Sequence, residues 1–168
     1  SKSFRRIVFD ELCANFLTLS ENRKRIRIVK SPKIFNNKSS ELIKKTLPFK
    51  LTKDQEKVLD EINRDLLSNK RMFRIIQGDV GSGKTIVSLL SILNVIKSGY
   101  QCALMSPTEI LAKQHYTLAK KIFKNQKFEI ELLTGKTEYK LRKVILNNLT
   151  SGKIKLLIGT HALFQKKI

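Results

Sequence analysis

Eight consecutive residues, from Gly78 to Thr85, have the types and spacing of a phosphate-binding loop. They match the pattern G-x-x-x-x-G-K-[ST] at every fixed position. Its glycines let the backbone turn tightly enough for successive N–H groups to point at one anion. We expect Lys84 to reach the β- and γ-phosphates of a nucleoside triphosphate, and the Thr85 hydroxyl to ligate Mg²⁺. The loop residues are Gly78, Asp79, Val80, Gly81, Ser82, Gly83, Lys84 and Thr85.

The residues on either side of the loop have the patterns that such a loop requires. The apolar run from Met72 to Gln77 predicts a strand that leads into the loop, and residues 85–97 predict a helix that leaves it. The start of that helix would add partial positive charge where the phosphates bind. A glycine-rich turn without a ligand is the alternative, and the complete motif between strand and helix argues against it.

Strands and helices are expected to alternate through the rest of the chain. Residues 102–106, 128–133 and 155–159 are predicted strands. Predicted helices cover residues 108–123, capped by Thr108, and 137–149, capped by Thr137, and Ser-Gly pairs at 98–99 and 151–152 are typical of helix ends. This order predicts an α/β fold: a parallel sheet with helices on both faces and ligands at the carboxyl ends of its strands.

Residues 1–46 are predicted to form a helical linker that precedes a domain of residues 47–168. Apolar residues at helical spacing predict an amphipathic helix over residues 4–24. After a basic segment and a polar stretch, Ser40 is expected to cap a short helix that reaches Thr46. A longer helix is predicted from Thr52 to Ser68.

The net charge of +20 is concentrated towards the two ends of the chain. Residues 1–50 and 109–168 each contain 13 basic and 4 acidic residues, whereas residues 51–108 contain 8 and 6. An AT-rich coding sequence would raise the lysine content throughout, but it does not account for a middle segment that is close to neutral. The distribution favours DNA as a partner, bound through its backbone and therefore independently of base sequence.

Composition argues against other classes of protein. No run of about 18 apolar residues is present, so no membrane span is expected. Asp10 and Glu11 interrupt the apolar stretch near the start, which argues against a signal-peptide core. Cys13 and Cys102 lack metal-ligand spacing, and we interpret them as reduced thiols of a cytoplasmic protein.

Phe49 and Gln55 form a second candidate group, near the start of the helix predicted from Thr52. Thr52 and Gln55 match a capping box, in which the glutamine reaches back to the cap residue. Gln55 could instead recognise the edge of adenine, because an amide both donates and accepts hydrogen bonds, with the Phe49 ring against the base. The two interpretations stay open at this point.

Three polar segments follow predicted strands, and we therefore expect them at one edge of the sheet. Their hydroxyls and exposed N–H groups are candidate contacts with a DNA backbone. A simple helix cap at Thr108 and a structural hydrogen bond at His161 are the alternative interpretations. The candidate residues are Thr108, Glu109, Gln114, His115, Thr134, Gly135, Thr160 and His161.

Hydrolysis of ATP at such a loop also requires an apolar strand that ends in Asp-Glu, to orient Mg²⁺ and water. Asp10-Glu11 and Asp60-Glu61 follow apolar residues, but both pairs lie in segments with helical spacing and precede the loop. No acidic pair lies between Thr85 and Ile168. We expect the chain by itself to bind ATP without hydrolysing it at a useful rate.

Together these motifs resemble those of the RecG branch-migration helicases of helicase superfamily 2. The resemblance rests mainly on residues 47–55, 77–85, 107–115 and 159–163. It implies a RecA-like motor domain with ATP and Mg²⁺ as cofactors, in which Phe49 and Gln55 recognise adenine. It also implies a monomeric DNA helicase that acts on branched DNA in recombination and repair. This chain would supply its linker helix and part of its first motor domain.

Other functions fit the residues less well. Transcription-repair coupling translocases share residues 78–81 and 159–161, but Ser82 and residues 108–110 are more similar to the RecG helicases. A P-loop kinase would need an arginine-rich lid, and only Arg142 follows the loop. A non-catalytic nucleic-acid-binding module with a vestigial loop disagrees with the intact Lys84 and Thr85.

Overall fold

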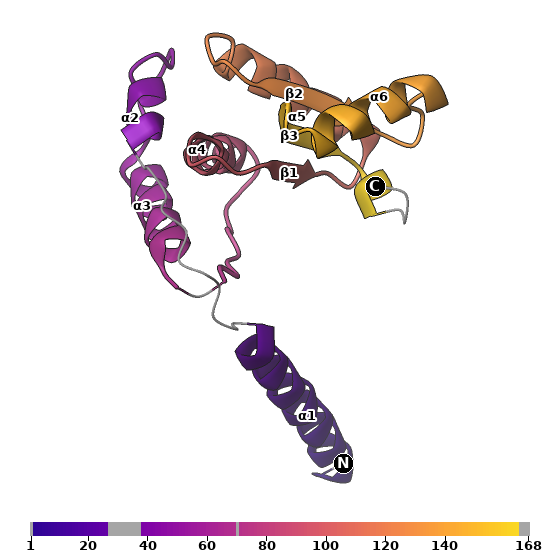
Figure 1. Ribbon diagram of the computed structural model, residues 1–168. Helices are drawn as coiled ribbons and strands as arrows, with labels where there is room; N and C mark the ends of the chain where they lie inside the picture. Colours follow the sequence, from indigo (N-terminus) through magenta and orange to yellow (C-terminus); the bar gives the residue numbers. More distant parts are fainter. Residues whose placement is uncertain (1, 27–37, 70, 165–168) are drawn as a thin grey trace.

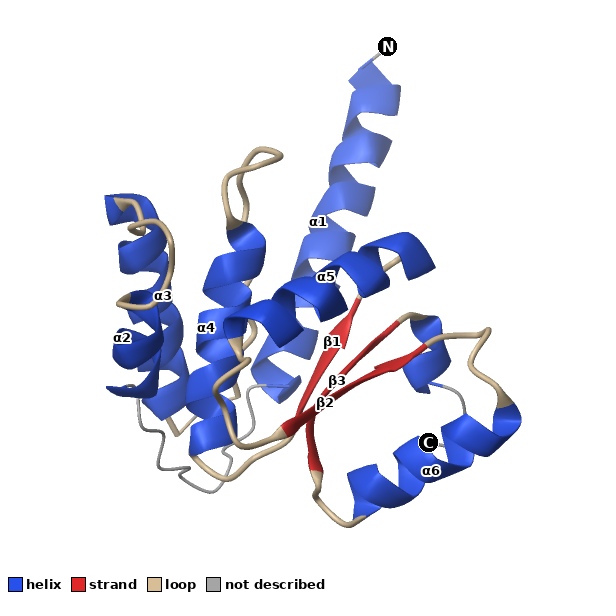
Figure 2. Ribbon diagram, turned by 90° about the horizontal axis from the view of Figure 1, so that it is seen from above, coloured by secondary structure: helices blue, strands red, loops and turns tan. Residues whose placement is uncertain are grey.

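A three-stranded parallel sheet lies at the centre of the C-terminal half of the chain (Figures 1 and 2). The structure is a computed structural model that describes residues 2–26, 38–69 and 71–164. Its strands are β1 (Cys102–Met105), β2 (Glu129–Leu133) and β3 (Ile154–Gly159), in the spatial order β1-β3-β2. Met105 and Leu133 both pair with Gly159, so the three strands end level with one another at their carboxyl ends.

Helices cover both faces of this sheet, which confirms the predicted α/β fold. Helix α5 (Glu109–Ile122) packs on β2 and β3, and α6 (Tyr139–Thr150) packs on the same two strands from the other face (Figure 2). Along β3, Leu156 and Ile158 belong to the larger apolar core and Leu157 to the smaller one beside α6. Burial of consecutive residues on both faces is typical of a parallel strand.

Helix α4 (Lys84–Lys97) joins the sheet to two further helices. It contacts β1, α3 (Lys53–Leu67) and α2 (Lys38–Lys44). The side chain of its buried Asn94 accepts a hydrogen bond from the Ser40 backbone N–H and donates one to the side-chain Oδ1 of Asn63, both at 3.0 Å. Because these buried polar groups satisfy one another, the three helices share one core. The predicted domain boundary near residue 46 stays a prediction. Helix α2 precedes that boundary, yet it packs in the same core as α4, which follows it.

Helix α1 (Lys2–Ile26) extends away from the sheet and its helices in Figure 1. Among its described side chains, apolar groups such as Phe9 and Phe16 are largely exposed. The amphipathic helix that the sequence predicts is therefore confirmed as a helix, two residues longer at each end. No described helix combines the length and the apolar character that a membrane span requires.

The predicted strand at Met72–Gln77 is wrong for this structure. Residues 71–77 form neither helix nor strand, and Phe73 and Ile75 are 63% and 80% exposed. A strand exists only where its N–H and C=O groups meet a second strand. Residues 71–77 pair with none of the three described strands, so the apolar pattern of residues 72–77 does not become a strand.

Two predicted helix starts are also corrected. Ser40 does not cap α2, because the helix begins at Lys38 and Ser40 lies within it. Thr137 does not cap α6, whose first residue is Tyr139 and whose cap position is Glu138. The Thr137 hydroxyl instead accepts a hydrogen bond from the Thr134 N–H at 3.0 Å and closes a turn before the helix. The Ser40 N–H thus has a partner far along the chain, whereas the Thr137 hydroxyl bonds to a residue three positions before it.

The remaining helices agree closely with prediction. Thr52 caps α3 in a complete capping box with Gln55, and Thr108 caps α5 by accepting from the Leu111 N–H. The acidic pairs Asp10-Glu11 and Asp60-Glu61 lie inside α1 and α3, as helical spacing indicates. Helices α4 and α6 end at the two predicted Ser-Gly pairs.

Candidate nucleotide-binding site and nucleic-acid interface

The loop at residues 78–85 has the backbone shape that its glycines predict. Gly81 and Gly83 have φ angles of 83° and 81°, in the left-handed region that favours glycine. Gly83 is also the cap residue of α4, and a Cβ atom there would collide with Nε2 of Gln55. No side chain caps α4, so its first backbone N–H groups are available to an anion.

The Lys84 ammonium group lies over the loop. It donates hydrogen bonds to the carbonyl oxygens of Gly78 and Asp79, both at 2.6 Å, and approaches the Ser82 Oγ at 3.4 Å. A single cation therefore draws the two sides of the loop together. A phosphate in the loop would offer this ammonium group stronger, charged acceptors than the carbonyl oxygens that it now contacts.

Gln55 connects the start of α3 to the loop. Its Oε1 accepts from the Thr52 N–H at 2.9 Å, as the capping box requires. Its Nε2 donates to the Ser82 carbonyl oxygen, also at 2.9 Å. The capping interpretation is confirmed. The adenine interpretation stays a prediction, since each amide atom retains one further hydrogen-bonding position.

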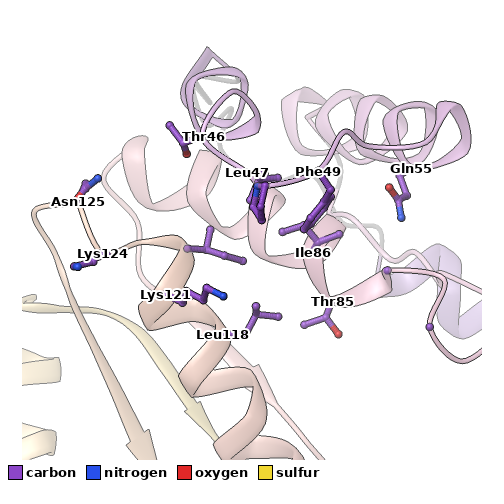
Figure 3. A pocket seen from close by; sticks show the side chains of 14 residues that line it. Thr46, Leu47, Phe49, Gln55, Thr85, Ile86, Leu118, Lys121, Lys124 and Asn125 are labelled. Atoms are coloured by element: carbon purple, nitrogen blue, oxygen red, sulfur yellow. The ribbon is translucent and has the colours of Figure 1, made fainter.

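A cavity of about 590 Å³ lies between these groups and the end of α5 (Figure 3). Phe49 and Gln55 line it from the segment before and the start of α3, and Thr85 lines it from the loop. Leu118 and Lys121 form the opposite wall, on α5. The cavity thus combines an aromatic ring, an amide and a hydroxyl within apolar walls, a composition common in small-molecule sites.

The predicted loop residues are divided between this cavity and a second one. The second cavity, of about 420 Å³, has Gly78, Asp79, Ser82 and Lys84 in its lining, whereas the first has Gly81, Gly83 and Thr85. Gln55 lines both cavities. Val80 lies at the tip of the loop with its side chain fully in solvent. In this structure Lys84 and Thr85 therefore face different sides of the loop.

Arg74 is a structural residue of this site that the sequence did not reveal. Its guanidinium group donates to Asp65 at 2.6 Å and to Glu61 at 2.7 Å, and so attaches the segment before the loop to α3. The hydrogen bond to Asp65 is the main cause of a raised Arg74 pKa. An arginine nine residues after Asp65 has no recognisable helical or strand spacing, so no sequence signal was available.

The candidate DNA-backbone residues lie at one edge of the sheet, as the topology predicts. Residues 134–135 and 160–161 directly follow β2 and β3, and residues 107–109 follow β1 after Ser106; the three strands end level. Glu109 and Lys136 form an ion pair at 3.5 Å that joins two of these segments. Thr108 is exposed, whereas Thr134 is buried and its hydroxyl accepts from the Lys136 N–H. The Thr134 side chain is therefore engaged in its own turn.

Two further candidates lie within α5, and two lie just after β3. Gln114 is exposed and His115 half-buried in the second turn of α5. Thr160 is half-buried, and His161 is exposed at the start of a 3-10 helix, η1 (His161–Phe164). Beneath this edge, the Ser106 hydroxyl is buried and has no hydrogen-bond partner among the described residues. In the described part of the chain, no group of three or more His, Cys, Asp or Glu side chains could hold a metal ion.

Comparison with known proteins adds independent observations. Residues 52–168 match the model of the DEAD/DEAH box helicase family. The chain is similar to the ATP-dependent DNA helicase RecG of Aquifex aeolicus, with 43% identity over 167 residues. It is similar to RecG of Bacillus subtilis, with 42% identity over 166 residues. These alignments cover 98% of this chain but only 21% and 24% of the relatives, so the chain spans about a quarter of their length or less.

Two solved helicase structures are also similar to this chain. A structure of RecG bound to a three-way DNA junction superposes with a TM-score of 0.82 and 40% identity, over 92% of this chain and 21% of that one. A hypothetical ATP-dependent RNA helicase from Sulfolobus tokodaii superposes with a TM-score of 0.58 at 19% identity, over 77% of this chain and 35% of that one. The second likeness supports the RecA-like fold alone.

Proposed function

This chain belongs to the DEAD/DEAH box helicase family, and we propose that it is part of an ATP-dependent DNA helicase of the RecG type. The observation that carries the proposal is the intact loop at residues 78–85, with Lys84 over it and an uncapped helix start behind it. This arrangement is chemically suited to the phosphates of a nucleotide. The cavity beside it, lined by Phe49 and Gln55, suits the base.

Different residues would bind the phosphates, the Mg²⁺ and the adenine of MgATP. The N–H groups at the start of α4 would donate to phosphate oxygens, and Lys84 would exchange the carbonyls of Gly78 and Asp79 for charged acceptors. Thr85 would supply a hydroxyl ligand to Mg²⁺, which neutralises phosphate charge. A hydroxyl ligand fits a cation that retains waters and phosphate oxygens among its ligands. Phe49 and Gln55 would hold adenine.

This chain is expected to bind ATP without hydrolysing it efficiently. After Thr85 the printed sequence contains no aspartate, so nothing in it orients Mg²⁺ and the attacking water together. We propose that the 168 residues bind ATP but turn it over slowly, and that hydrolysis belongs to the larger protein. A DNA-stimulated rate of about 1 s⁻¹ or more from these residues alone would contradict that proposal.

The sheet edge is the proposed contact with DNA. Thr108, Gly135, Thr160 and His161 would hold phosphates through N–H groups and side chains, without the arginine or asparagine pairs that distinguish bases. We therefore propose binding that is independent of base sequence. The relative bound to a three-way junction supports branched DNA as the substrate of the intact protein. Residues 1–46 would form its linker from a preceding DNA-binding domain.

Titration calorimetry with MgATP tests the nucleotide proposal. Lys84→Ala should reduce affinity at least tenfold, since it removes a charge-assisted contact worth roughly 1.5–3 kcal/mol. Lys57→Ala is the matched control, because Lys57 is an exposed lysine of α3 outside both cavities. Equal affinity in the two variants would contradict the assignment of the loop.

A further inference from the structure

The cavity beside the phosphate loop is larger than the nucleobase proposed for it. Its volume of about 590 Å³ is typical of cavities that enclose drug-sized ligands, and adenine is much smaller than such ligands. Figure 3 shows Gln55 and Thr85 at one end of the cavity and Thr46, Lys124 and Asn125 at the other. A base held by Gln55 therefore leaves space at the opposite end.

We call that opposite end, formed by Thr46, Lys121, Lys124 and Asn125, the far end of the cavity. Thr46 lies in the turn after α2, Lys121 in the last turn of α5, and Lys124 and Asn125 in the turn that follows α5. The Phe123 side chain at the end of α5 is buried in the larger core and fixes this turn on it. The far end is therefore formed by segments that the fold already holds in place, as is usual for small-molecule sites.

The far end is positively charged. Lys121 and Lys124 are exposed, and neither forms an ion pair with a described residue. Among the described residues that line the cavity, none is acidic. A hollow with charge of one sign and apolar walls concentrates the electric field and attracts ions of the opposite sign. The amide of Asn125 adds a hydrogen-bond donor for such an anion.

Apolar side chains form the wall between the far end and the phosphate loop. Leu47 comes from the segment before α3, and Leu118 and Ile122 come from α5. All three pack against the larger core but are only partly buried. A ligand with an apolar body would cover the surface that they leave exposed, and this burial would favour binding.

We propose that the far end binds a small molecule with a compact apolar body and one anionic group, such as an aromatic carboxylate or sulfonate. The anionic group would contact Lys121 and Lys124, and the body would lie against Leu47 and Leu118. One charge suffices, because the apolar walls offer no partner to further charged groups. This site would be independent of the phosphate loop, since Lys84 lines the other cavity.

A fluorescence titration with anilinonaphthalene sulfonate tests this site, because the probe has an aromatic body and one anionic group and reports contact with apolar surface. Wild type should bind the probe at one saturable site. The double variant Lys121→Gln/Lys124→Gln should bind it about tenfold more weakly, because it loses the charge-assisted contacts. Unchanged affinity in this variant would overturn the proposal.

The matched control is the double variant Lys97→Gln/Lys127→Gln. It removes the same charge from two exposed lysines that line neither this cavity nor the one at Lys84. Its affinity for the probe should equal that of wild type. An equal loss in the control would show a general effect of net charge and would overturn the assignment to the far end.

Filling the far end tests its position without changing its charge. Thr46→Trp should abolish binding of the probe, because Thr46 lines the far end and an indole there would occupy the space. Thr46→Ser should bind normally, since it retains the hydroxyl that donates to the Ile43 carbonyl oxygen at 2.9 Å. Equal melting temperatures of the two variants would show that both fold. Normal binding of the probe by folded Thr46→Trp would overturn the proposal.

The variant Lys84→Ala separates this site from the nucleotide site. It should lose affinity for MgATP and keep the wild-type affinity for the probe. A loss of probe binding as large as that in Lys121→Gln/Lys124→Gln would place the probe at the phosphate loop and overturn the proposal. If wild type binds the probe in the expected way but does not bind MgATP, the far end is supported and the proposed function fails.

Discussion

Residues 72–77 and strand β1 have similar apolar sequences but different structures. β1 pairs along its length with β3 and places Cys102 and Leu104 against the core, whereas residues 71–77 stay irregular with exposed apolar side chains. The phosphate loop is consequently attached by side chains, through Arg74 to α3 and through Gln55 to the Ser82 carbonyl. Backbone hydrogen bonds between strands therefore hold the sheet in place, whereas individual side-chain hydrogen bonds hold the loop.

Gly159→Ala should have the largest effect on stability, because it disturbs the pairing of β3 with β2. A Cβ atom at this position would overlap the Leu133 carbonyl oxygen and press against the Leu163 side chain. We expect a loss of about 3 kcal/mol in the free energy of unfolding, measured with urea. Gly135→Ala is the control, since the nearest atom to its Cβ is 3.9 Å away. Equal free energies of unfolding for the two variants would contradict this prediction, because they would show that the sheet accommodates a Cβ atom at residue 159.

Gln55→Ala should cost about 1 kcal/mol of stability, since it removes half of a capping box and the contact with the loop. It should also reduce the preference for ATP over GTP if the amide recognises adenine. Thr52→Ala separates the two roles, because it removes the cap and retains the amide. If Thr52→Ala loses the preference for ATP over GTP to the same extent, Gln55 affects this preference through the helix cap and not through contact with adenine.

The half-buried Cys102, at the start of β1, predicts a pH dependence that the loop segment does not share. Burial raises the pKa of Cys102 to about 11, so the folded chain holds its proton where the unfolded chain releases it. Stability should therefore be complete below about pH 9 and fall as pH rises towards 11. At pH 10 wild type should have lost about 1 kcal/mol more than Cys102→Ala, relative to pH 8. Parallel losses in urea denaturation would contradict a buried thiol.

Arg74→Ala should give the smallest change in stability. Both of its ion pairs are partly exposed, and solvent screens such pairs. The melting temperature should fall slightly at about 0.05 M salt, and the difference should vanish at about 0.5 M. A large, salt-independent loss would show that the segment before the loop is part of the core.

Much of this molecule could be predicted from residue pattern. The caps at Thr52 and Thr108 and the glycine-dependent loop follow from local sequence, because each depends on neighbours within a few residues. The three strands follow from their apolar pattern, and each also pairs with a strand further along the chain. The failures share a cause. Residues 72–77 lack a partner strand, and Ser40 and Arg74 contact residues distant in sequence or at no regular spacing. The division of Lys84 and Thr85 between two cavities also depends on tertiary contacts that spacing does not encode.

Hydrogen exchange with and without MgATP tests the central claim most directly. The account predicts slower exchange for amides at residues 81–85, because their N–H groups would donate to phosphate oxygens. It predicts no change for β2, on the far side of the sheet, and no protection in Lys84→Ala. Unchanged exchange at residues 81–85 in the presence of saturating MgATP, or equal protection in Lys84→Ala, would contradict the assignment of this loop as the nucleotide site.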